Sequence, residues 1–148
     1  MLVNLSLGLA TMVVCLLLQS LLLVVAARFY ARRERDLASP SFWSSVVVIN
    51  GVMLILIVGN LGQLTLWALV FVVLGEFDAL GQAVYHSAVN FATLGYGDIV
   101  MSEKHRLLGA LEAVNGVLMF GMSTAALSWA FQDAMRRLSK ARREGSRQ

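Results

Sequence analysis

The sequence predicts an all-α membrane protein in which three helices cross the bilayer and a shorter helix enters it without crossing. Three observations support this fold class. The chain of 148 residues is 58% hydrophobic and 14% charged, whereas soluble domains are about 25% charged. Its apolar residues gather in three runs, each long enough to span a hydrocarbon core of ~30 Å as a helix. A fourth, shorter run precedes a segment with glycine at alternate positions.

The basic residues form two clusters, Arg28 to Arg35 and Arg136 to Arg147, each close behind an apolar run. Nucleic acid is one partner that such clusters suit, but a position beside membrane spans favours a topology signal instead. The single cysteine, Cys15, cannot form an internal disulfide, and the sequence has no Cys/His cluster with metal-ligand spacing and no nucleophile–base pattern. We therefore expect no enzyme, no nucleic-acid partner, no small-molecule substrate and no organic cofactor.

Residues 1–28 are predicted to form the first spanning helix, because an apolar run covers nearly all of them. The competing interpretation is a cleaved signal peptide. The positive charge follows the run instead of preceding it, and cleavage would leave the later glycine-rich loop in the cytoplasm, so we favour an uncleaved helix. The arginines then place residues 29–42 in the cytoplasm as a loop and the N-terminus outside. Pro40 predicts a turn, with Ser39 or Ser41 capping the next helix.

Residues 43–76 are predicted to form the second spanning helix, with Trp43 as an interfacial anchor. The run is longer than the bilayer core requires, so we expect the helix to tilt, to project into the cytoplasm or to bend near Asn50 and Gly51. Three residues at spacings of three and four share one face and are expected to hydrogen-bond to another helix; they are Asn60, Gln63 and Trp67.

Residues 78–92 form an amphipathic run that is too short to span, since its helix would be only ~21 Å long. Asp78 is well placed to cap its N-terminus. Non-helical backbone at membrane depth is tolerated only where protein covers it or where it lines a water-filled cavity. This run and the segment 93–98 therefore predict a re-entrant loop, in which the C-terminal end of the helix directs partial negative charge toward a cation.

The segment 93–98 reads Thr-Leu-Gly-Tyr-Gly-Asp. Gly95 and Gly97 can adopt φ > 0, which other residues rarely do. Successive carbonyls can then turn to one side instead of alternating as in a strand. A row of such oxygens, closed into a ring by neighbouring subunits, can replace the water shell of a monovalent cation.

Residues 106–135 are predicted to form the third spanning helix, and residues 139–148 a basic cytoplasmic tail. The topology is consistent throughout: the N-terminus lies outside, the loop is reached from outside and the C-terminus lies inside. We expect a multi-pass protein of the cell (inner) membrane.

The segment Thr-Leu-Gly-Tyr-Gly-Asp resembles the selectivity filter of potassium channels, with Leu94 where the commonest form has valine. Residues 43–138 resemble the outer helix, pore loop and inner helix of bacterial potassium channels, to which residues 1–28 are an addition. Each chain supplies one pore loop, whereas the filter of the family needs four. The resemblance therefore implies a homotetramer with a potassium-channel pore fold that passes K⁺ passively.

The resemblance also implies roles for the loop residues. K⁺ would be bound by the Thr93 hydroxyl and by the backbone carbonyls of Thr93, Leu94, Gly95 and Tyr96. Gly97 would let the chain turn away at the outer mouth, and Asp98 would lie behind or above the filter and help to hold it. Tyr96 and Leu94 would face the pore helix.

The pore helix departs from the family pattern. The best-known small channels carry two tryptophans and an acid there, whereas the matching residues of this chain are Tyr85, His86 and Val89. The network that braces the filter must therefore differ, and we expect His86 or Asn90 to take part in it. His105, in the outer loop, is expected to be solvated.

The third helix carries one acid inside its predicted span, Glu112. An ionisable group in hydrocarbon is costly and by default indicates function. Two interpretations stay open: a buried hydrogen bond to Gln63 or Trp67, which lie at similar depth, or a proton-sensitive group that couples the inner helix to the filter.

Gly116 and Gly121 interrupt the same helix. Glycine permits close packing in membrane helices, while the resemblance implies a gating hinge near Gly116. One face of the helix would line the cavity and inner gate, with residues at spacings of three and four, namely Leu118, Met122, Ala125 and Trp129. Trp129 is alternatively an interfacial anchor.

No helix has arginine at every third position, as a voltage sensor requires, and the tail is too short for a cytoplasmic gating domain. A leak channel, or one controlled by pH, lipid or tension, is what the sequence predicts. Residues 136–147 are a candidate site for anionic lipid. The alternatives are a non-conducting or accessory membrane subunit, or a component of a potassium uptake transporter, although such transporters carry four pore-loop units on one chain.

Overall fold

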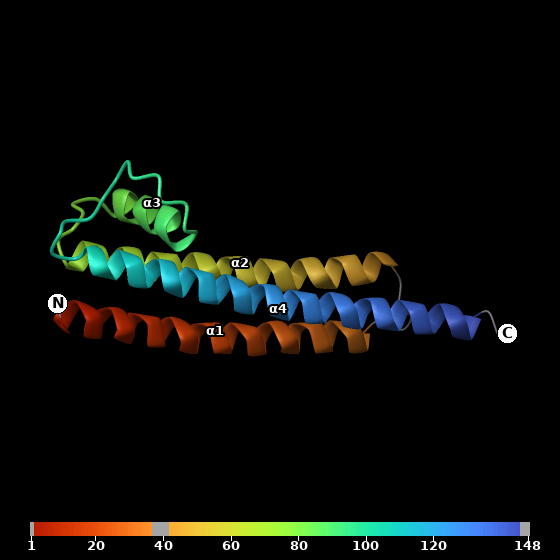
Figure 1. The fold of residues 1–148 in the computed structure, drawn as a ribbon. Helices are drawn as coiled ribbons and strands as arrows, with labels where there is room; N and C mark the ends of the chain where they lie inside the picture. The colour runs from red at the N-terminus through yellow and green to blue at the C-terminus, as the bar shows by residue number, and fades with distance from the viewer. Residues whose placement is uncertain (1, 37–41, 146–148) are drawn as a thin grey trace. The chain divides into compact units, whose positions relative to one another are not determined.

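The computed structural model describes residues 2–36 and 42–145, and these are helical apart from the connections before and after the third helix. The order is α1 (Leu2–Asp36), α2 (Phe42–Val73), α3 (Leu80–Phe91) and α4 (Arg106–Gly145) (Figure 1). No strand occurs within the described residues. α1, α2 and α4 are long and apolar enough to cross a membrane. The predicted all-α membrane fold is confirmed.

The first connection is shorter than expected, because α1 continues to Asp36. The prediction that residues 29–36 form part of a loop is wrong. Arginine, alanine and glutamate are good helix formers, so the change from apolar to charged sequence marks a change of environment and not the end of the helix. The turn at Pro40 and the caps at Ser39 and Ser41 lie outside the described residues.

α4 also extends further than expected, to Gly145 and not to residue 135. Most of the predicted basic tail is thus the end of this helix. The Arg137 Nε donates to Asp133 Oδ2 at 2.7 Å, four residues earlier, and such i,i+4 pairs support an exposed helix.

α3 has 12 residues, a length of ~18 Å that is too short to span a bilayer. Its N-cap is Ala79, with no side-chain hydrogen bond, so the prediction that Asp78 caps the helix is wrong. The amides of Gln82 and Ala83 donate to the Ala79 carbonyl instead. The first turn is therefore closed by backbone alone.

The chain forms two compact units. The first comprises Met1–Ser20 and Gly59–Gly121 and contains α3 with the loop that follows it. In this unit α1 packs tightly on α4, since a Cβ at Gly8 would lie 2.4 Å from Leu111 Cδ1.

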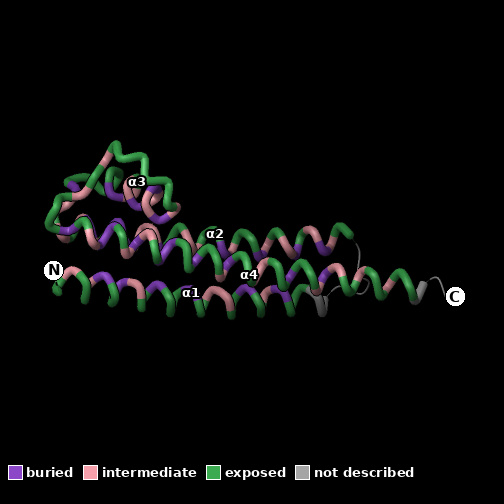
Figure 2. The backbone as a smooth tube through the Cα atoms, viewed as in Figure 1, coloured by how far each residue is buried: buried purple, intermediate pink, exposed green. Residues whose placement is uncertain are grey.

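The second unit comprises Leu21–Val58 and Met122–Gln148. Figure 2 shows that buried and exposed residues alternate along its helices, as expected for helices with one packed face. Its core is formed by small and branched residues around one tyrosine, namely Ala26, Tyr30, Val48, Val52, Leu56 and Ala130. The Tyr30 hydroxyl donates to Asp133 Oδ2 at 3.1 Å, which satisfies its polar end.

Candidate functional site

The loop that follows α3 has an alternating backbone. φ is −81° at Ala92, and it is positive at every second residue after that, with 59° at Thr93, 61° at Gly95 and 74° at Gly97. Where ψ alternates as well, such an alternation turns successive N–H groups to one face and the carbonyls of planar trans peptides to the opposite face. Gly95 and Gly97 thus adopt the positive φ that the sequence predicts for them.

Thr93 is the one non-glycine residue with positive φ among the described residues. A β-branched residue in this conformation is an outlier that costs roughly 1–2 kcal/mol. Two backbone bonds hold it there: its amide donates to the Asn90 carbonyl at 2.9 Å, and the Leu94 amide donates to the Val89 carbonyl at 2.8 Å. This is a Schellman motif, whose left-handed position is usually occupied by glycine. A threonine kept at such a position points to a requirement for its side chain.

All six residues of the loop, 93–98, are exposed in the single chain, as the stretch after α3 in Figure 2 shows. Leu94 is 55% exposed and Tyr96 67% exposed. Exposed large apolar side chains that lie close together are typical of surfaces that bind another molecule.

Tyr85 and His86 on α3 hold the ascending side of the loop. The Tyr85 hydroxyl donates to Asp98 Oδ2 at 2.7 Å, and this bond lowers the pKa of the Asp98 carboxyl and raises the pKa of the Tyr85 hydroxyl. The His86 Nδ1 lies 3.0 Å from the Ile99 carbonyl oxygen; because a carbonyl only accepts, this nitrogen carries the proton. His86 thus contacts the residue that follows the loop 93–98, whereas the sequence offered Tyr85 only as a departure from the family pattern.

Asn90 turns away from the loop and toward α4. Its Nδ2 donates to the Gly109 carbonyl at 2.6 Å and to Glu112 Oε2 at 2.8 Å. The Glu112 side chain is fully buried. Asn90 therefore joins α3 to the inner helix, and the contact between Asn90 and Glu112 places the buried acid directly behind the end of α3.

The predicted partners of Glu112 are wrong. The Gln63 Nε2 donates to Gln19 Oε1 of α1 at 2.7 Å, while the Trp67 ring packs against Phe71 with centroids 5.9 Å apart. The spacing on α2 correctly predicted that Gln63 bonds to another helix. It could not show that α1 is the helix opposite.

Gly116 and Gly121 of α4 have different surroundings. A Cβ at Gly116 would lie 1.9 Å from the Phe91 carbonyl oxygen, so the last residue of α3 rests on the backbone of α4 at this point. Nothing lies within 4 Å of a Cβ at Gly121. Close packing thus accounts for Gly116, and packing within the chain does not account for Gly121.

The predicted pore-lining face of α4 is partly exposed. Leu118 and Trp129 are 46% and 55% exposed. In the second unit Met122, Ala125 and Trp129 line an apolar pocket of about 460 Å³ together with Tyr30. The Trp129 ring meets the Tyr30 ring edge-on, with centroids 5.4 Å apart, so this part of the face turns toward α1 within the chain.

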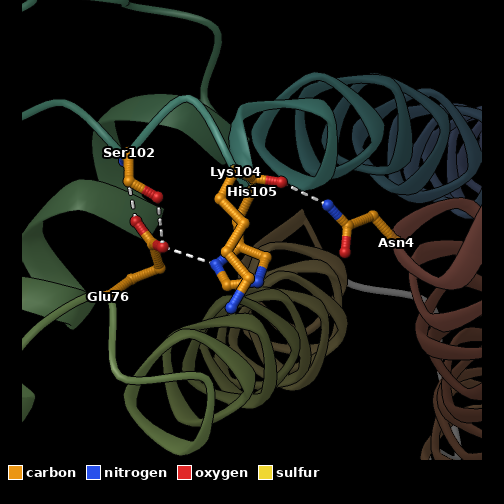
Figure 3. Close-up of polar contacts among 5 residues, drawn as sticks. All are labelled: Asn4, Glu76, Ser102, Lys104 and His105. Atoms are coloured by element: carbon orange, nitrogen blue, oxygen red, sulfur yellow. Dashed lines mark hydrogen bonds and ion pairs between the residues drawn. The ribbon is translucent and has the colours of Figure 1, made fainter. Parts of the chain in front are cut away.

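A polar cluster that the sequence analysis did not predict lies in the segment between the loop 93–98 and α4 (Figure 3). Glu76 accepts hydrogen bonds from the Ser102 hydroxyl at 2.6 Å and from the Ser102 amide at 2.8 Å. The His105 Nδ1 lies 2.5 Å from Glu76 Oε1, and both side chains are 6% exposed. The Asn4 amide of α1 donates to the Lys104 carbonyl. The prediction that His105 is solvated is wrong.

The cluster favours the ionised form of Glu76. Burial of the carboxyl opposes its charge, but the hydrogen bonds from Ser102 and His105 outweigh burial and hold the pKa of Glu76 below its ordinary value. Ser102 and His105 belong to the segment that leads from the loop 93–98 to α4, so Glu76 anchors the outer end of that segment to the end of α2.

Comparison with known proteins identifies the family. A family model described as "Ion channel" matches residues 55–133, more than half of the chain, from α2 through α3 and the loop into α4. No curated protein and no solved structure gave a significant match. α1 lies outside the matched residues. The chain belongs to this ion channel family.

Proposed function

We propose that the chain is one subunit of a homotetrameric channel that is selective for K⁺ and passes it down its gradient. The observation that carries the proposal is the sign alternation of φ from Thr93 to Gly97, on the residues Thr-Leu-Gly-Tyr-Gly. Membership of an ion channel family and the short helix α3 before the loop support it.

Selectivity would arise when the ion exchanges its water for backbone oxygens. The backbone carbonyls of Thr93, Leu94, Gly95 and Tyr96 would form the stacked sites. The Thr93 hydroxyl would add a further oxygen. Gly97 would turn the chain away at the outer mouth. Adjacent sites would be filled by neighbouring ions, whose repulsion lets each ion leave despite favourable binding. The partial negative charge at the end of α3 would help to attract the cation.

Four subunits are proposed because one loop supplies only one row of carbonyl oxygens. A single row of oxygens reaches one side of an ion, whereas a hydration shell surrounds it. The exposed side chains of Leu94 and Tyr96 would be covered by neighbouring subunits, which would also brace the loop from outside. The proposed orientation has the N-terminus outside and the C-terminus in the cytoplasm, since the arginines follow α1 and end α4.

The rival proposals are an accessory membrane subunit that does not conduct and a component of a potassium uptake transporter. A non-conducting subunit would not require a threonine in the strained conformation of Thr93. We propose that the channel either conducts as an ungated leak or is gated by pH, lipid or tension. Glu112 is the candidate proton-sensitive group.

Flux into liposomes that hold the purified protein alone tests the proposal. We expect K⁺ uptake without Na⁺ uptake, and a tetramer by mass measurement in detergent. Gly95→Ala should abolish selective uptake because alanine is strained at φ 61°. The matched control is Gly81→Ala on α3, where φ is not positive and nothing lies within 4 Å of the new Cβ. Equal uptake of Na⁺ and K⁺, or a monomer, would contradict the proposal.

A further inference from the structure

Three arginines lie together at the end of α1 and make a positively charged surface. Arg28 and Arg32 are four residues apart, which places them on one face of the helix. Arg33 lies over the Phe29 ring, with its guanidinium carbon 5.9 Å from the ring centroid. All three arginines are exposed. Among the described side chains, neither Arg28 nor Arg32 is paired with a carboxylate.

Two hollows lie beside these arginines. Apolar side chains line part of each hollow, and we call these side chains its floor. The first has a volume of about 540 Å³ and lies between the arginines and α2; it is lined by Val25, Arg28, Phe29, Arg32, Arg33 and Ile55. The second has a volume of about 640 Å³ and shares Phe29 and Arg33 with the first, while α2 contributes Trp43, Gly51 and Leu54 to it. Phe29 therefore separates two parts of one groove between α1 and α2.

A glycine makes this groove possible. A Cβ at Gly51 would lie 2.4 Å from Phe29 Cε1 and 2.6 Å from Phe29 Cζ. The Phe29 ring thus rests directly on the backbone of α2. Any side chain at residue 51 would displace the ring and change the floor of both hollows.

We propose that this groove binds an anionic phospholipid, with the phosphate on Arg28 and Arg32 and an acyl chain along the apolar floor. Guanidinium groups match phosphate oxygens in two-pronged hydrogen bonds. A free phosphate would leave the floor uncovered, whereas an acyl chain would cover the exposed side chains of Val25 and Leu54. The groove also lies where charged sequence replaces apolar sequence along α1, and Trp43 is typical of the membrane interface there.

The end of α4 offers a comparison within the same unit. Its hollow of about 380 Å³ is also basic and is lined by Met135, Arg136, Ser139, Lys140 and Arg143. Met135 is the one apolar residue that lines it, whereas Val25, Phe29 and Ile55 line the first hollow at α1. The inference gives a role to the helix that lies outside the family match, and it does not depend on ion conduction.

The test measures lipid binding to the full-length protein by native mass spectrometry in detergent, with phosphatidylglycerol and phosphatidylcholine as probes. We expect phosphatidylglycerol to bind at least fivefold more tightly. The double variant Arg28→Gln/Arg32→Gln should weaken its binding roughly 25-fold, at about fivefold for each basic group. The control variant Arg136→Gln/Lys140→Gln removes the same charge from α4 and should change binding less than twofold.

Two further measurements distinguish binding through the phosphate alone from binding that also needs the apolar floor. Gly51→Ala keeps every charge and should still weaken phosphatidylglycerol binding, because it displaces Phe29. Soluble glycerol phosphate at the same concentration should not bind. Equal losses in the α1 and α4 variants, equal binding of the two lipids, or binding of glycerol phosphate as tight as that of the lipid would each overturn the proposal. K⁺ flux is measured separately, so a protein that binds lipid but does not conduct contradicts the proposed function alone.

Discussion

The hydroxyl of Tyr85 on α3 donates a hydrogen bond of 2.7 Å to Asp98, the last residue of the exposed loop. The Schellman motif at Thr93 holds the beginning of the loop, and Tyr85 holds its end. The four residues between these anchors have no other described support from their own chain. The loop is therefore tied at both ends by its own chain.

Tyr85→Phe should reduce K⁺ flux several-fold and raise relative Na⁺ uptake, because Asp98 loses its tether while the ring stays in place. Asp98→Asn should have a similar effect, and the double variant should be little worse than either single one. Flux assays of the three variants provide the measurement. Fully additive losses would mean that the two residues act independently.

The effect of this tether should not change between pH 5 and pH 8. The folded pKa of Asp98 is lowered, so its contribution is present above its ordinary value of about 3.9 and is lost only as the pH falls through the lowered value. A difference between wild type and Asp98→Asn that disappears near neutral pH would contradict this assignment.

Thr93→Gly should stabilise the isolated fold while it abolishes selective conduction. Glycine relieves a left-handed strain of roughly 1–2 kcal/mol, less the larger entropy of an unfolded glycine, so a gain of about 1 kcal/mol in the free energy of unfolding is expected. The hydroxyl that would bind K⁺ is lost. Thr93→Ser is the control, because it keeps both the hydroxyl and the strain. Thermal unfolding and K⁺ flux of both variants are compared; a destabilised Thr93→Gly protein would contradict the strain argument.

Asn90→Leu should destabilise the protein by about 1–3 kcal/mol, because it leaves the buried Glu112 oxygen without its donor. The double variant Asn90→Leu/Glu112→Leu removes both partners and should recover much of that loss. Unfolding of the three variants in detergent provides the measurement. A double variant that is less stable than Asn90→Leu would show that Glu112 has other partners of greater importance.

Much of the fold could be predicted because it depends on local sequence. The apolar runs are long enough to span, the run before Thr93 is too short, and alternate glycines permit the observed φ values. The end of α1 could not be predicted from the arginines, since charge reports the surroundings of a residue and arginine is compatible with a helix. Within the site, His86 was identified because it replaces an expected residue next to the loop.

The contacts between distant segments could not be predicted. Glu76 and His105 are 29 residues apart and meet only because the chain folds back between them. Neither residue stands in an unusual local pattern. The predicted partner of Glu112 was wrong for the same reason. The sequence indicates how deep Gln63 lies in the membrane, but it does not show which helix the side chain faces.

Glu76→Gln should lower the free energy of unfolding by about 2 kcal/mol at pH 7, because hydrogen bonds to a charged acceptor are replaced by weaker ones. The folded pKa of Glu76 is lowered. Its stabilisation is therefore present above the ordinary value of about 4.3 and is lost as the pH falls through the lowered folded value. The variant should show a flatter dependence of stability on pH below pH 5.

Glu103→Gln is the control for Glu76, since it removes the same charge from a side chain that is 94% exposed. Thermal unfolding between pH 3 and pH 8 is measured for both variants. If the control lost as much stability as Glu76→Gln, net charge and not the Ser102 and His105 contacts would explain the effect.

Gly116→Ala distinguishes packing from a hinge. The new Cβ would lie 1.9 Å from the Phe91 carbonyl oxygen, so α3 must shift away from α4, and such overpacking typically costs about 1–3 kcal/mol. Packing predicts a loss of stability. A hinge predicts normal stability with altered opening, since alanine favours a straight helix. Gly121→Ala, with nothing within 4 Å of its Cβ, should leave the unfolding midpoint of the subunit unchanged or raise it slightly, because alanine is up to ~1 kcal/mol more favourable than glycine inside a helix. If Gly116→Ala is as stable as Gly121→Ala, the contact with Phe91 is not the reason for glycine at residue 116.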